Sequence, residues 1–540
     1  MANSHVFVIR GDITHLKCDA WMLPSDSRSS VTTAWTDAIP GLADAVSRTT
    51  SSAYKAGELF ALALDGLPTE DPLPIMTAVP LRGFADADEL APRIREFVRV
   101  GAREAKRRRE DHPSIVSRPI PLLAMPLFGT LGGGGHLLKG DVLDVILREA
   151  QKTATEEGVD VVLVLRDERT FALAQVKRKA PRYWQSLDGG LLRKAQGLAE
   201  IAKLGRLVPF MGAGTSVSAG APIWADLIKL LAEKAGLSDA EKIGLFEGGM
   251  DALDQAAYLR ARHETRMAEA SSSEDGCALP TFNMEIANLL SLSRYGLAPA
   301  LLACLRTEQA ITMNYDTLFE TASQDIGDER AVIPDRAVGG QNKWLLKLHG
   351  SVLNPESIVL TRDDYLGYNT SRDALSAVVK ANLITHHLLF VGFGLRDDHF
   401  HEIIHDVGRA VPSDAQNTAG FATALTLFAN PLHDTLWNKK LDLVSMSGTP
   451  KEENTTTVES AARTLEIFLD ALLAHATDSH SYLLADEFEH ALSLGERNLR
   501  ESLIGLNADF SESEKGTASW EVVAATLRAL GLAESDNRAG

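Results

Sequence analysis

Short apolar segments alternate with amphipathic segments along most of the chain. A short apolar run bounded by Gly, Pro or Asp is typical of a buried strand, whereas apolar positions three and four residues apart are typical of a helix. In the first third of the chain the clearest helices are predicted at residues 90–110 and 140–158. Strands are predicted within residues 5–12, 18–24, 74–81, 120–129 and 159–167.

The middle of the chain repeats this alternation. Strands that are apolar throughout and separated by helices indicate a sheet covered on both faces, which is usually parallel. We therefore predict two α/β layers, the second a Rossmann-like, doubly wound sheet that binds ligands at the carboxyl ends of its strands. Its strands are expected within residues 205–212, 309–316, 343–350, 386–394 and 422–429, with a further one at 441–446.

Shifts in composition suggest where the domains begin and end. The basic and aromatic stretch at residues 177–184 indicates a connector, and the chain beyond residue 477 is polar and helical. The expected parts are an α/β domain at 1–175, a linker at 176–199, a second α/β domain at 200–477 and a short helical C-terminal segment at 478–540.

Composition excludes several classes of protein. The 540 residues carry a formal net charge of −19, so a generally basic nucleic-acid-binding protein is not expected. Cys18, Cys277 and Cys304 lie far apart, which excludes a disulfide scaffold and a four-cysteine zinc ribbon. With neither a long apolar run nor a signal-peptide pattern, the protein is expected to be cytoplasmic.

A glycine-rich turn carries the sharpest chemical signal. An apolar strand leads into Gly212, Ala213, Gly214, Thr215 and Ser216, and a helix is predicted after them. Glycine lets a ligand approach the backbone closely, and loop amides can bind a diphosphate. The spacing is neither GxGxxG nor a Walker loop, so for this segment alone a tight turn without a ligand is an equal alternative.

Three further strands of the second domain also end in glycine or polar residues. Each strand end alone is explained by a helix cap or by a core histidine, but four of them in one parallel sheet are expected to converge on one site. The three are Thr312, Asn314 and Asp316 at the first, His349 and Gly350 at the second, and Gly392 and Gly394, with Asp397 beyond, at the third.

These four segments together resemble the sirtuin-like proteins that consume NAD. The family pattern has a GAGxS loop, a TxNxD strand end, an HG strand end and a late GxG or GxS loop. Here they read GAGTS, TMNYD, HG and GFG, and the spellings NYD, KLHG and GFGLRDD are similar to those of bacterial antiviral-defence sirtuins. The resemblance covers residues 200–475, about half the chain.

The resemblance implies an NAD hydrolase that releases nicotinamide and ADP-ribose without a metal, as an antiviral-defence effector that depletes NAD when triggered. Asn314 would orient water and the ribose hydroxyls, Asp316 the ribose or its developing cation, and His349 would act as general base. Such an effector must be silent at rest, which implies a regulator: a nucleotide signal, an activating partner protein or an assembly. The resemblance also implies a homo-oligomer. The nucleotide would be bound by Gly212, Ala213, Gly214, Thr215, Ser216, Trp224, Asp226, Thr312, Gly392 and Gly394.

Three departures from the family pattern concern the substrate. Without the four-cysteine ribbon the acyl-lysine groove lacks its support, so protein deacylation is not expected. Trp224 stands where a phenylalanine covers the nicotinamide, and Asp226 follows without the usual arginine. Gly394 replaces a frequent serine, which removes one hydrogen bond to a ribose or phosphate.

One pattern points to a metal. His401, Glu402 and His405 spell HExxH, which on a helix places both histidines on one face, as in zinc proteases. The third histidine of the longer form is absent, because Val411 occupies its position. A polar helix face that spells the pattern by chance is the favoured interpretation, and no metal is expected.

The first domain resembles macro domains, which bind ADP-ribose, over residues 5–175. The resemblance rests on GDIT at 11–14, on the pair Asp19-Ala20 and on the loop ending in Gly132–Gly135. It implies that Asp12 contacts adenine and that the loop binds phosphate, so an ADP-ribose-derived nucleotide is a candidate signal. The usual asparagine pair is replaced at residues 24–26, so a macro-type hydrolase is not expected, and a purely structural domain is the alternative.

Three other functions stay open. The first is an ADP-ribosyltransferase that uses NAD, and the second is a module in which NAD is only a regulatory ligand. The third is a nuclease-associated or DNA-binding component that uses the basic run of Arg103 and residues 106–109. For that run a solvated helix face is the favoured interpretation.

Overall fold

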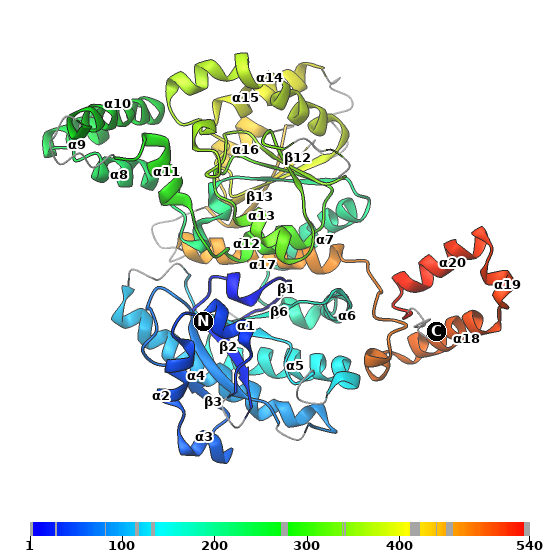
Figure 1. Ribbon diagram of the computed structural model, residues 1–540. Helices are drawn as coiled ribbons and strands as arrows, with labels where there is room; N and C mark the ends of the chain where they lie inside the picture. The colour runs from blue at the N-terminus through cyan, green and yellow to red at the C-terminus, as the bar shows by residue number, and fades with distance from the viewer. Residues whose placement is uncertain are drawn as a thin grey trace. The chain divides into compact units, whose positions relative to one another are not determined.

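The chain divides into two units, shown in the computed structural model of Figure 1. The first unit comprises residues 1–199 and 467–540, and the second comprises residues 200–466. The structure describes residues 4–26, 30–80, 83–113, 118–130, 135–271, 279–336, 339, 342–410, 422–438, 440–449 and 457–533.

The first unit is built on a six-stranded sheet. Its strand order is β1-β6-β5-β2-β4-β3, and every neighbouring pair is parallel except β3 and β4. Burial of almost every residue in β1, β5 and β6 explains why these segments are apolar throughout. The strands are β1 Val6–Arg10, β2 Ala20–Ser25, β3 Ala61–Ala63, β4 Leu73–Ala78, β5 Leu122–Pro126 and β6 Asp160–Leu165.

Amphipathic helices cover this sheet. In α4 (Ala91–Asp111) the buried side chains, among them Ile94, Phe97 and Val98, recur three and four positions apart, so one face packs against the sheet. Its neighbour α5 (Lys139–Glu157) follows the same rule. The remaining helices before residue 179 are α1 Thr33–Ala38, α2 Leu42–Thr49, α3 Ser52–Ala56 and α6 Glu168–Arg178.

The C-terminal part of the chain belongs to the first unit. In α17 (Val458–Ala476), Asp470 accepts hydrogen bonds from both terminal nitrogens of Arg178 and lies 2.8 Å from Nε2 of His5. Because all three side chains are fully buried, these contacts tie the end of α17 to β1 and α6. The helices α18 Leu494–Asp509, α19 Glu512–Lys515 and α20 Ala518–Ala529 follow.

This division differs from the expected one at two places. Residues 176–199, expected to be a linker, lie within the first unit and include most of α7 (Gly189–Lys203). Residues 467–477, expected to end the second domain, also join the first unit. Sequence patterns mark where helices begin and end, but they do not show which sheet a helix joins.

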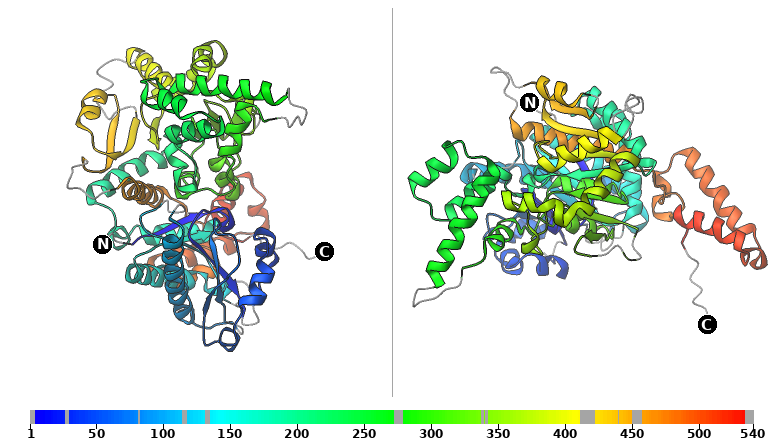
Figure 2. Two further views of the ribbon diagram at one scale, coloured as in Figure 1. Left: turned by 90° about the vertical axis from the view of Figure 1, so that its left-hand side faces the viewer. Right: turned by 90° about the horizontal axis from the view of Figure 1, so that it is seen from above.

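The second unit contains a seven-stranded sheet in the order β13-β12-β11-β7-β8-β10-β9, and every neighbouring pair is parallel. The predicted parallel α/β architecture is therefore confirmed. Figure 1 and the right-hand view of Figure 2 show the helices within residues 224–290 extending away from this sheet. The strands are β7 Leu207–Met211, β8 Gln309–Thr312, β9 Ala331–Ile333, β10 Trp344–Lys347, β11 His387–Val391, β12 Ala422–Phe428 and β13 Asp442–Ser447.

Helices connect these strands. Those between β7 and β8 contribute Leu231, Leu259 and Ile286 to a second apolar core, which also includes Tyr315 and Leu360. The main core lies on the sheet and includes Phe210, Phe390 and Phe400. The helices are α8 Trp224–Lys234, α9 Asp239–Glu247, α10 Ala252–Ser271, α11 Phe282–Leu290, α12 Leu297–Cys304, α13 Leu318–Asp325, α14 Arg362–Thr385, α15 Asp398–Ala410 and α16 Pro431–Trp437.

The register of the second sheet aligns four strand ends. Met211 pairs with both Thr312 and Val391, and Thr312 pairs with Lys347. After β7 the chain builds β8, β9 and β10 on one side and then returns to build β11 on the other. The carboxyl ends of β7 and β11 therefore form a topological switch point, where open α/β sheets bind ligands.

Two smaller findings concern the sequence predictions. The strands β3 and β9 were missed, because three residues are too few to show a period. The basic run on α4 makes contacts within the first unit: Arg109 pairs with Asp19 and Arg108 donates to the carbonyl oxygen of Thr69.

Among the described residues, no helix combines the length and the apolar character needed to cross a bilayer.

Candidate active site

Two glycine turns interlock at the switch point. The amide of Gly212 donates to the carbonyl oxygen of Val391, and the amide of Gly214 donates to that of Gly392, both at 2.9 Å. A Cβ atom on Gly212 would lie 2.6 Å from the carbonyl oxygen of Gly392. A Cβ atom on Gly214 would lie 2.7 Å from the Cα atom of Gly392. Gly392 itself has φ +63°, and a Cβ there would lie 2.3 Å from the amide nitrogen of Thr215. These three glycines are therefore required by backbone contact.

The strand end after β8 joins the first of these turns. The side-chain amide of Asn314 donates to Oγ1 of Thr215 at 3.2 Å and to Oγ of Ser216 at 3.1 Å. Ser216 donates in turn to Oδ2 of Asp316 at 2.8 Å. The backbone amide of Asn314 donates to Oγ1 of Thr312 at 3.0 Å. This bond fixes the turn from which the side chain of Asn314 extends.

Asp316 is occupied by structural contacts. Its Oδ1 accepts from the amide of Leu318 at the start of α13, while Ser216 binds the other oxygen. The fully buried Lys347 donates to its backbone carbonyl oxygen at 2.5 Å and to Glu320 at 2.7 Å. Asp316 therefore holds the turn of Asn314 in place rather than offering a free carboxylate.

His349 lies level with Asn314 on the neighbouring strand. Each follows the Thr312–Lys347 pair by two residues, and the amide of Leu348 donates to the carbonyl oxygen of Thr312 at 3.0 Å. Gly350 has φ +95°, and a Cβ there would lie 2.2 Å from the carbonyl oxygen of Ser357. This turn lets the chain leave β10 immediately after His349, which is 4% exposed.

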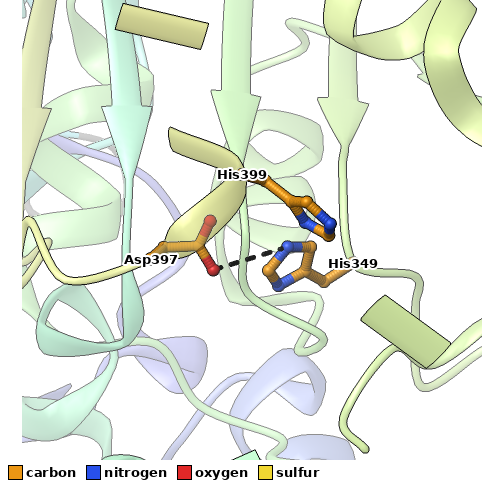
Figure 3. A group of neighbouring side chains, drawn as sticks. All are labelled: His349, Asp397 and His399. Carbon is orange, nitrogen blue, oxygen red and sulfur yellow. Dashed lines mark ion pairs between the residues drawn. The ribbon is translucent and has the colours of Figure 1, made fainter. Parts of the chain in front are cut away.

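The imidazole of His349 faces a carboxylate and a second imidazole (Figure 3). Nε2 of His349 lies 3.9 Å from Oδ2 of Asp397, and the ring of His399 stands nearly perpendicular to it at 5.8 Å between centroids. Asp397 caps α15 through the amide of Phe400 and accepts from the hydroxyl of Tyr365 at 2.7 Å. The ring of His399 stacks on Tyr365, with centroids 4.5 Å apart.

Burial lowers the pKa of His349 to about 4, and the nearby charge of Asp397 only partly opposes this shift. The imidazole is therefore neutral at physiological pH, with a nitrogen lone pair available to accept a proton. Burial, together with the charge of Asp397, also raises the pKa of Tyr365, so its phenol stays protonated and keeps donating to that carboxylate.

Three of the side chains predicted from the sequence each carry a buried polar atom that lacks a hydrogen-bond partner among the described residues. The three atoms are Oδ1 of Asn314, Nε2 of His349 and Nε1 of Trp224. An unpaired buried polar atom costs roughly 1–3 kcal/mol, so such atoms in a folded protein call for an explanation. All three side chains had been singled out from the sequence, and a polar ligand that bonds them would remove the cost.

Other expected ligand contacts are engaged or exposed. The amides of Gly212, Gly214, Thr215 and Ser216 donate to protein carbonyl groups. Asp226 is exposed and pairs with Lys229 at 3.2 Å. Gly394 is exposed, and a Cβ there would meet nothing within 4 Å. The four amides would therefore have to exchange hydrogen bonds to hold a diphosphate, and Asp226 lies on the surface of α8.

The HExxH residues do not converge. His401 is bonded through Nε2 to the carbonyl oxygen of Leu395 at 3.0 Å and packs against Trp437. His405 is exposed on α15. Within the described ranges, the group of side chains that could hold a metal ion is instead His349, Asp397 and His399, just before this pattern.

The candidate ligand-binding residues of the first unit are bonded to other protein groups or lie outside the described residues. Asp12 accepts from the amide and hydroxyl of Thr14 and pairs with Arg166 at 2.7 Å. Of the predicted phosphate loop, Gly132–Gly134 lie outside the described residues, and Gly135 is bonded to the carbonyl oxygen of Gly129.

Sequence reasoning missed His399, Tyr365 and the role of Asp397. The sequence places Asp397 and His399 close behind the GFG turn, which is a usable signal because that turn ends a central strand. Tyr365 lies in α14, far from any strand end, and no local pattern connects it to the site.

Comparison with known proteins identifies part of the second unit. Residues 308–440 match the model of the SIR2-like domain, so the predicted sirtuin-like identity is confirmed for this region. Defense-associated sirtuin 2 of Bacillus subtilis is 29% identical over 218 residues, which are 39% of this chain and 20% of that protein.

Two further relatives carry the name NAD(+) hydrolase ThsA. The protein of Bacillus cereus (strain MSX-D12) is 27% identical over 211 residues, 38% of this chain and 40% of that protein. The protein of Enterococcus faecium is 26% identical over 219 residues, 39% of this chain and 41% of that protein. The chain thus matches less than half the length of each of these relatives.

Solved structures of the Oceanobacillus iheyensis macrodomain also align with this chain. The structure with MES bound has a TM-score of 0.25 and 16% identity, and covers 33% of this chain and 93% of that one. The structure with ADP has a TM-score of 0.24 at the same identity and coverage. The macro-like interpretation of residues 5–175 accordingly stays a prediction from the sequence.

Proposed function

We propose that this chain, whose second unit contains a SIR2-like domain, hydrolyses NAD to nicotinamide and ADP-ribose at the carboxyl ends of β7, β8, β10 and β11. Relatives named NAD(+) hydrolase, aligned over 38–39% of this chain, support the choice of substrate. The four strand ends that interlock here are the segments expected to bind the nucleotide.

One observation carries the proposal. An amide oxygen of Asn314 and an imidazole nitrogen of His349 are buried without partners at level positions on neighbouring strands. The amide oxygen is a hydrogen-bond acceptor, and so is Nε2 in the neutral imidazole that carries its proton on Nδ1. Two acceptors side by side suit a donor such as water or a ribose hydroxyl, the groups that take part in cleavage of a riboside.

The reaction follows from these acceptors. The bond between C1′ of the ribose and the nicotinamide nitrogen breaks, its electron pair goes to that nitrogen, and neutral nicotinamide leaves. Positive charge develops on the ribose, and a water oxygen forms the new bond to C1′. Asn314 orients the water or the ribose hydroxyls, and His349 accepts the released proton at Nε2, which gives ADP-ribose. A positioned general base contributes roughly 10²–10⁴-fold to such a step.

The glycine turns are assigned to the nucleotide. Ala213 and Gly214 are exposed, so a phosphate can approach the backbone there. Thr215 and Ser216 lie beneath them and bond Asn314, which couples the diphosphate loop to the catalytic amide. Trp224, with an unpartnered buried Nε1, is assigned to the nicotinamide end of the site. Asp226, on the surface of α8, has no assigned contact.

The test measures NAD, nicotinamide and ADP-ribose in cells that express the full chain, with and without phage challenge. Wild type is compared with Asn314→Ala and His349→Ala, and with His405→Ala as a control for an exposed histidine of the same unit. We expect NAD loss with free nicotinamide and ADP-ribose in wild type and in the control, and neither in the two site variants. Equal NAD loss in all four proteins would contradict the assignment.

Transfer to an acceptor other than water is distinguished in the same experiment. With NAD labelled in the adenosine part, hydrolysis leaves the label in free ADP-ribose, whereas an ADP-ribosyltransferase leaves it on protein. Label on protein without bulk loss of NAD would replace hydrolysis by transfer. NAD that binds to all variants without turnover would support a regulatory ligand instead.

The name of one relative, Defense-associated sirtuin 2, also motivates a role in antiviral defence, in which NAD is depleted only after a trigger. Regulation by homo-oligomerisation, by an activating partner protein or by an ADP-ribose-derived nucleotide at the first unit belongs to this proposal. Isothermal titration of the full chain with ADP-ribose, compared with Asp12→Ala, tests the nucleotide. Equal heats of binding in both proteins would remove Asp12 from that role.

A further inference from the structure

We propose that His349, Asp397 and His399 form a binding site for one divalent transition-metal ion of the zinc class. The three side chains each offer one ligand atom, and these atoms all lie within 4.8 Å of one another (Figure 3). His349 lies just after β10, whereas Asp397 and His399 come from the start of α15, so the site joins two elements of the second unit.

Unpartnered nitrogens are the second observation. Nε2 of His349 and Nδ1 of His399 are both buried, and neither has a hydrogen-bond partner within the described part of the chain. Buried polar atoms are normally bonded, so two such nitrogens beside one carboxylate mark a position that a ligand is expected to fill. One cation can bond the lone pairs of both nitrogens at the same time, whereas a single N–H or O–H group bonds one of them well.

The spacing fits a shared ion. Zinc binds imidazole nitrogen and carboxylate oxygen at ~2.0–2.2 Å, so two donors at a tetrahedral angle on one ion lie ~3.3–3.6 Å apart. The 3.9 Å between Nε2 of His349 and Oδ2 of Asp397 is a little longer than this and is too long for a hydrogen bond. The largest separation in the group, up to 4.8 Å, requires the two side chains to approach each other by about 1.2–1.5 Å in total.

The chemistry of the donors selects the class of metal. Two imidazoles and one carboxylate are typical of divalent transition metals such as Zn²⁺ and Fe²⁺, whereas Mg²⁺ and Ca²⁺ prefer oxygen ligands. Asp397 is held by the hydroxyl of Tyr365 and the amide of Phe400, and His399 is held by stacking on Tyr365. Such outer contacts orient metal ligands and limit the loss of side-chain freedom on binding.

Metal binding has a consequence that rests on the proposed function. An ion on Nε2 of His349 occupies the lone pair that accepts the proton during NAD cleavage. Zinc is therefore expected to inhibit the hydrolase. Binding itself does not depend on hydrolysis, so the two claims fail separately.

The test titrates the metal-free full chain with Co²⁺ and records visible d–d absorption, which strengthens when Co²⁺ leaves water for a nitrogen-containing site of low coordination number. We expect one bound ion per chain and displacement by Zn²⁺. His399→Gln, which keeps a planar side chain of similar size, should weaken binding at least tenfold, and so should Asp397→Asn. His405→Gln is the matched control, because it removes a histidine of the HExxH pattern from the same helix.

Three results would overturn the proposal. They are absence of the strengthened absorption in wild type, unchanged Co²⁺ affinity in both His399→Gln and Asp397→Asn, and loss of binding in the His405→Gln control. Circular dichroism of each metal-free variant separates lost binding from lost folding. If a variant unfolds, the wild type is treated with diethyl pyrocarbonate with and without Zn²⁺. Zn²⁺ is expected to protect His349 and His399 from modification, and a lack of protection would overturn the proposed metal site.

The consequence for turnover is measured separately. With each protein compared with its own metal-free rate, the Zn²⁺ concentration for half inhibition of NAD loss should rise at least tenfold in His399→Gln. Metal binding without inhibition would leave the site but refute the general-base role of His349. Absence of hydrolysis in every protein, with Co²⁺ bound, would refute the proposed function and leave the metal site standing.

Discussion

Each unit of the molecule buries a histidine beside an aspartate, but the two pairs differ in their hydrogen bonds. In the first unit, His5 is bonded through Nδ1 to Ser186 at 2.7 Å and through Nε2 to Asp470 at 2.8 Å. In the second unit, Nε2 of His349 has no partner among the described residues and lies 3.9 Å from Asp397. Both histidines are under 9% exposed, so burial alone does not separate them.

The difference separates a structural pair from a functional one. A buried polar network with every member bonded rigidifies the fold, whereas an unpaired buried atom costs free energy unless a ligand bonds it. Asp470 also accepts from Arg178, so the first pair joins β1, α6 and α17. Asp397 is bonded by Tyr365 and Phe400, which leaves the imidazole of His349 to face whatever binds.

The largest expected effect is a loss of activity without a loss of stability. His349→Gln should reduce NAD cleavage by roughly 10²–10⁴-fold, because it removes the proton acceptor. His5→Gln should leave the rate per folded molecule within about twofold, since the hydrogen bonds of His5 lie within the first unit. Product assays on samples matched for folded protein by circular dichroism test this, and equal losses in both variants would erase the distinction.

The next effect is on stability and has the opposite pattern. Asp470→Ala should lower the free energy of unfolding of the first unit by roughly 3–5 kcal/mol, because it leaves Arg178 buried without its partner. Asp397→Ala, in the partly exposed cap of α15, should cost only about 1 kcal/mol. Urea denaturation followed by hydrogen exchange in peptides from β1 and α15 measures both. A smaller cost at Asp470 than at Asp397 would reverse the comparison.

The pH dependence sharpens the description of His349. Its pKa is lowered from 6.5 to about 4 by burial, so the unfolded chain takes up the proton first as the pH falls. Stability contributed by the neutral imidazole is therefore present above pH 6.5 and is lost as the pH falls towards 4, by at most ~1.4 kcal/mol per pH unit. NAD cleavage should stay active down to a pH near 4 as far as His349 is concerned.

Unfolding curves of wild type and His349→Gln between pH 4 and 7.5 measure this dependence, with activity profiles alongside. The variant should lose less stability than wild type across the window. A wild-type activity profile with its acid limb near 6.5 would show that the acting imidazole is in contact with water.

The smallest effect concerns the glycine turns. Gly392→Ala should reduce kcat/KM for NAD about tenfold, because φ +63° costs an L-residue roughly 1–2 kcal/mol and its Cβ would press on Thr215. Gly394→Ala is the matched control, since its Cβ would meet nothing within 4 Å. Steady-state kinetics distinguish them, and equal behaviour would show that the turns move apart freely.

The features that could be predicted from the sequence are those that depend on the local pattern of apolar and polar residues. The apolar runs identified the strands of both sheets except β3 and β9, and parallel pairing followed from their uniform burial. Asn314, Thr215, Ser216 and Asp316 were expected together because parallel strands end at one edge, and their side chains are in contact.

What the sequence did not show depends on contacts between distant segments. His5 and Asp470 are 465 positions apart, and the local sequence around either residue gives no indication that the two are in contact. Asp316 was expected to orient the ribose or its developing cation, and in the structure its two oxygens accept hydrogen bonds from Ser216 and from the amide of Leu318 at the start of α13. The HExxH spelling drew attention to His401 and His405, whereas the histidine that approaches His349 is His399, two positions earlier.

The interlocked turns also constrain how this protein can change over time. Gly212, Gly214 and Gly392 meet backbone to backbone, and each is already the smallest residue available. A larger side chain at one of them has no compensating reduction at the other two, so no pair of substitutions restores the contact. A library that randomises all three positions should return glycine at each.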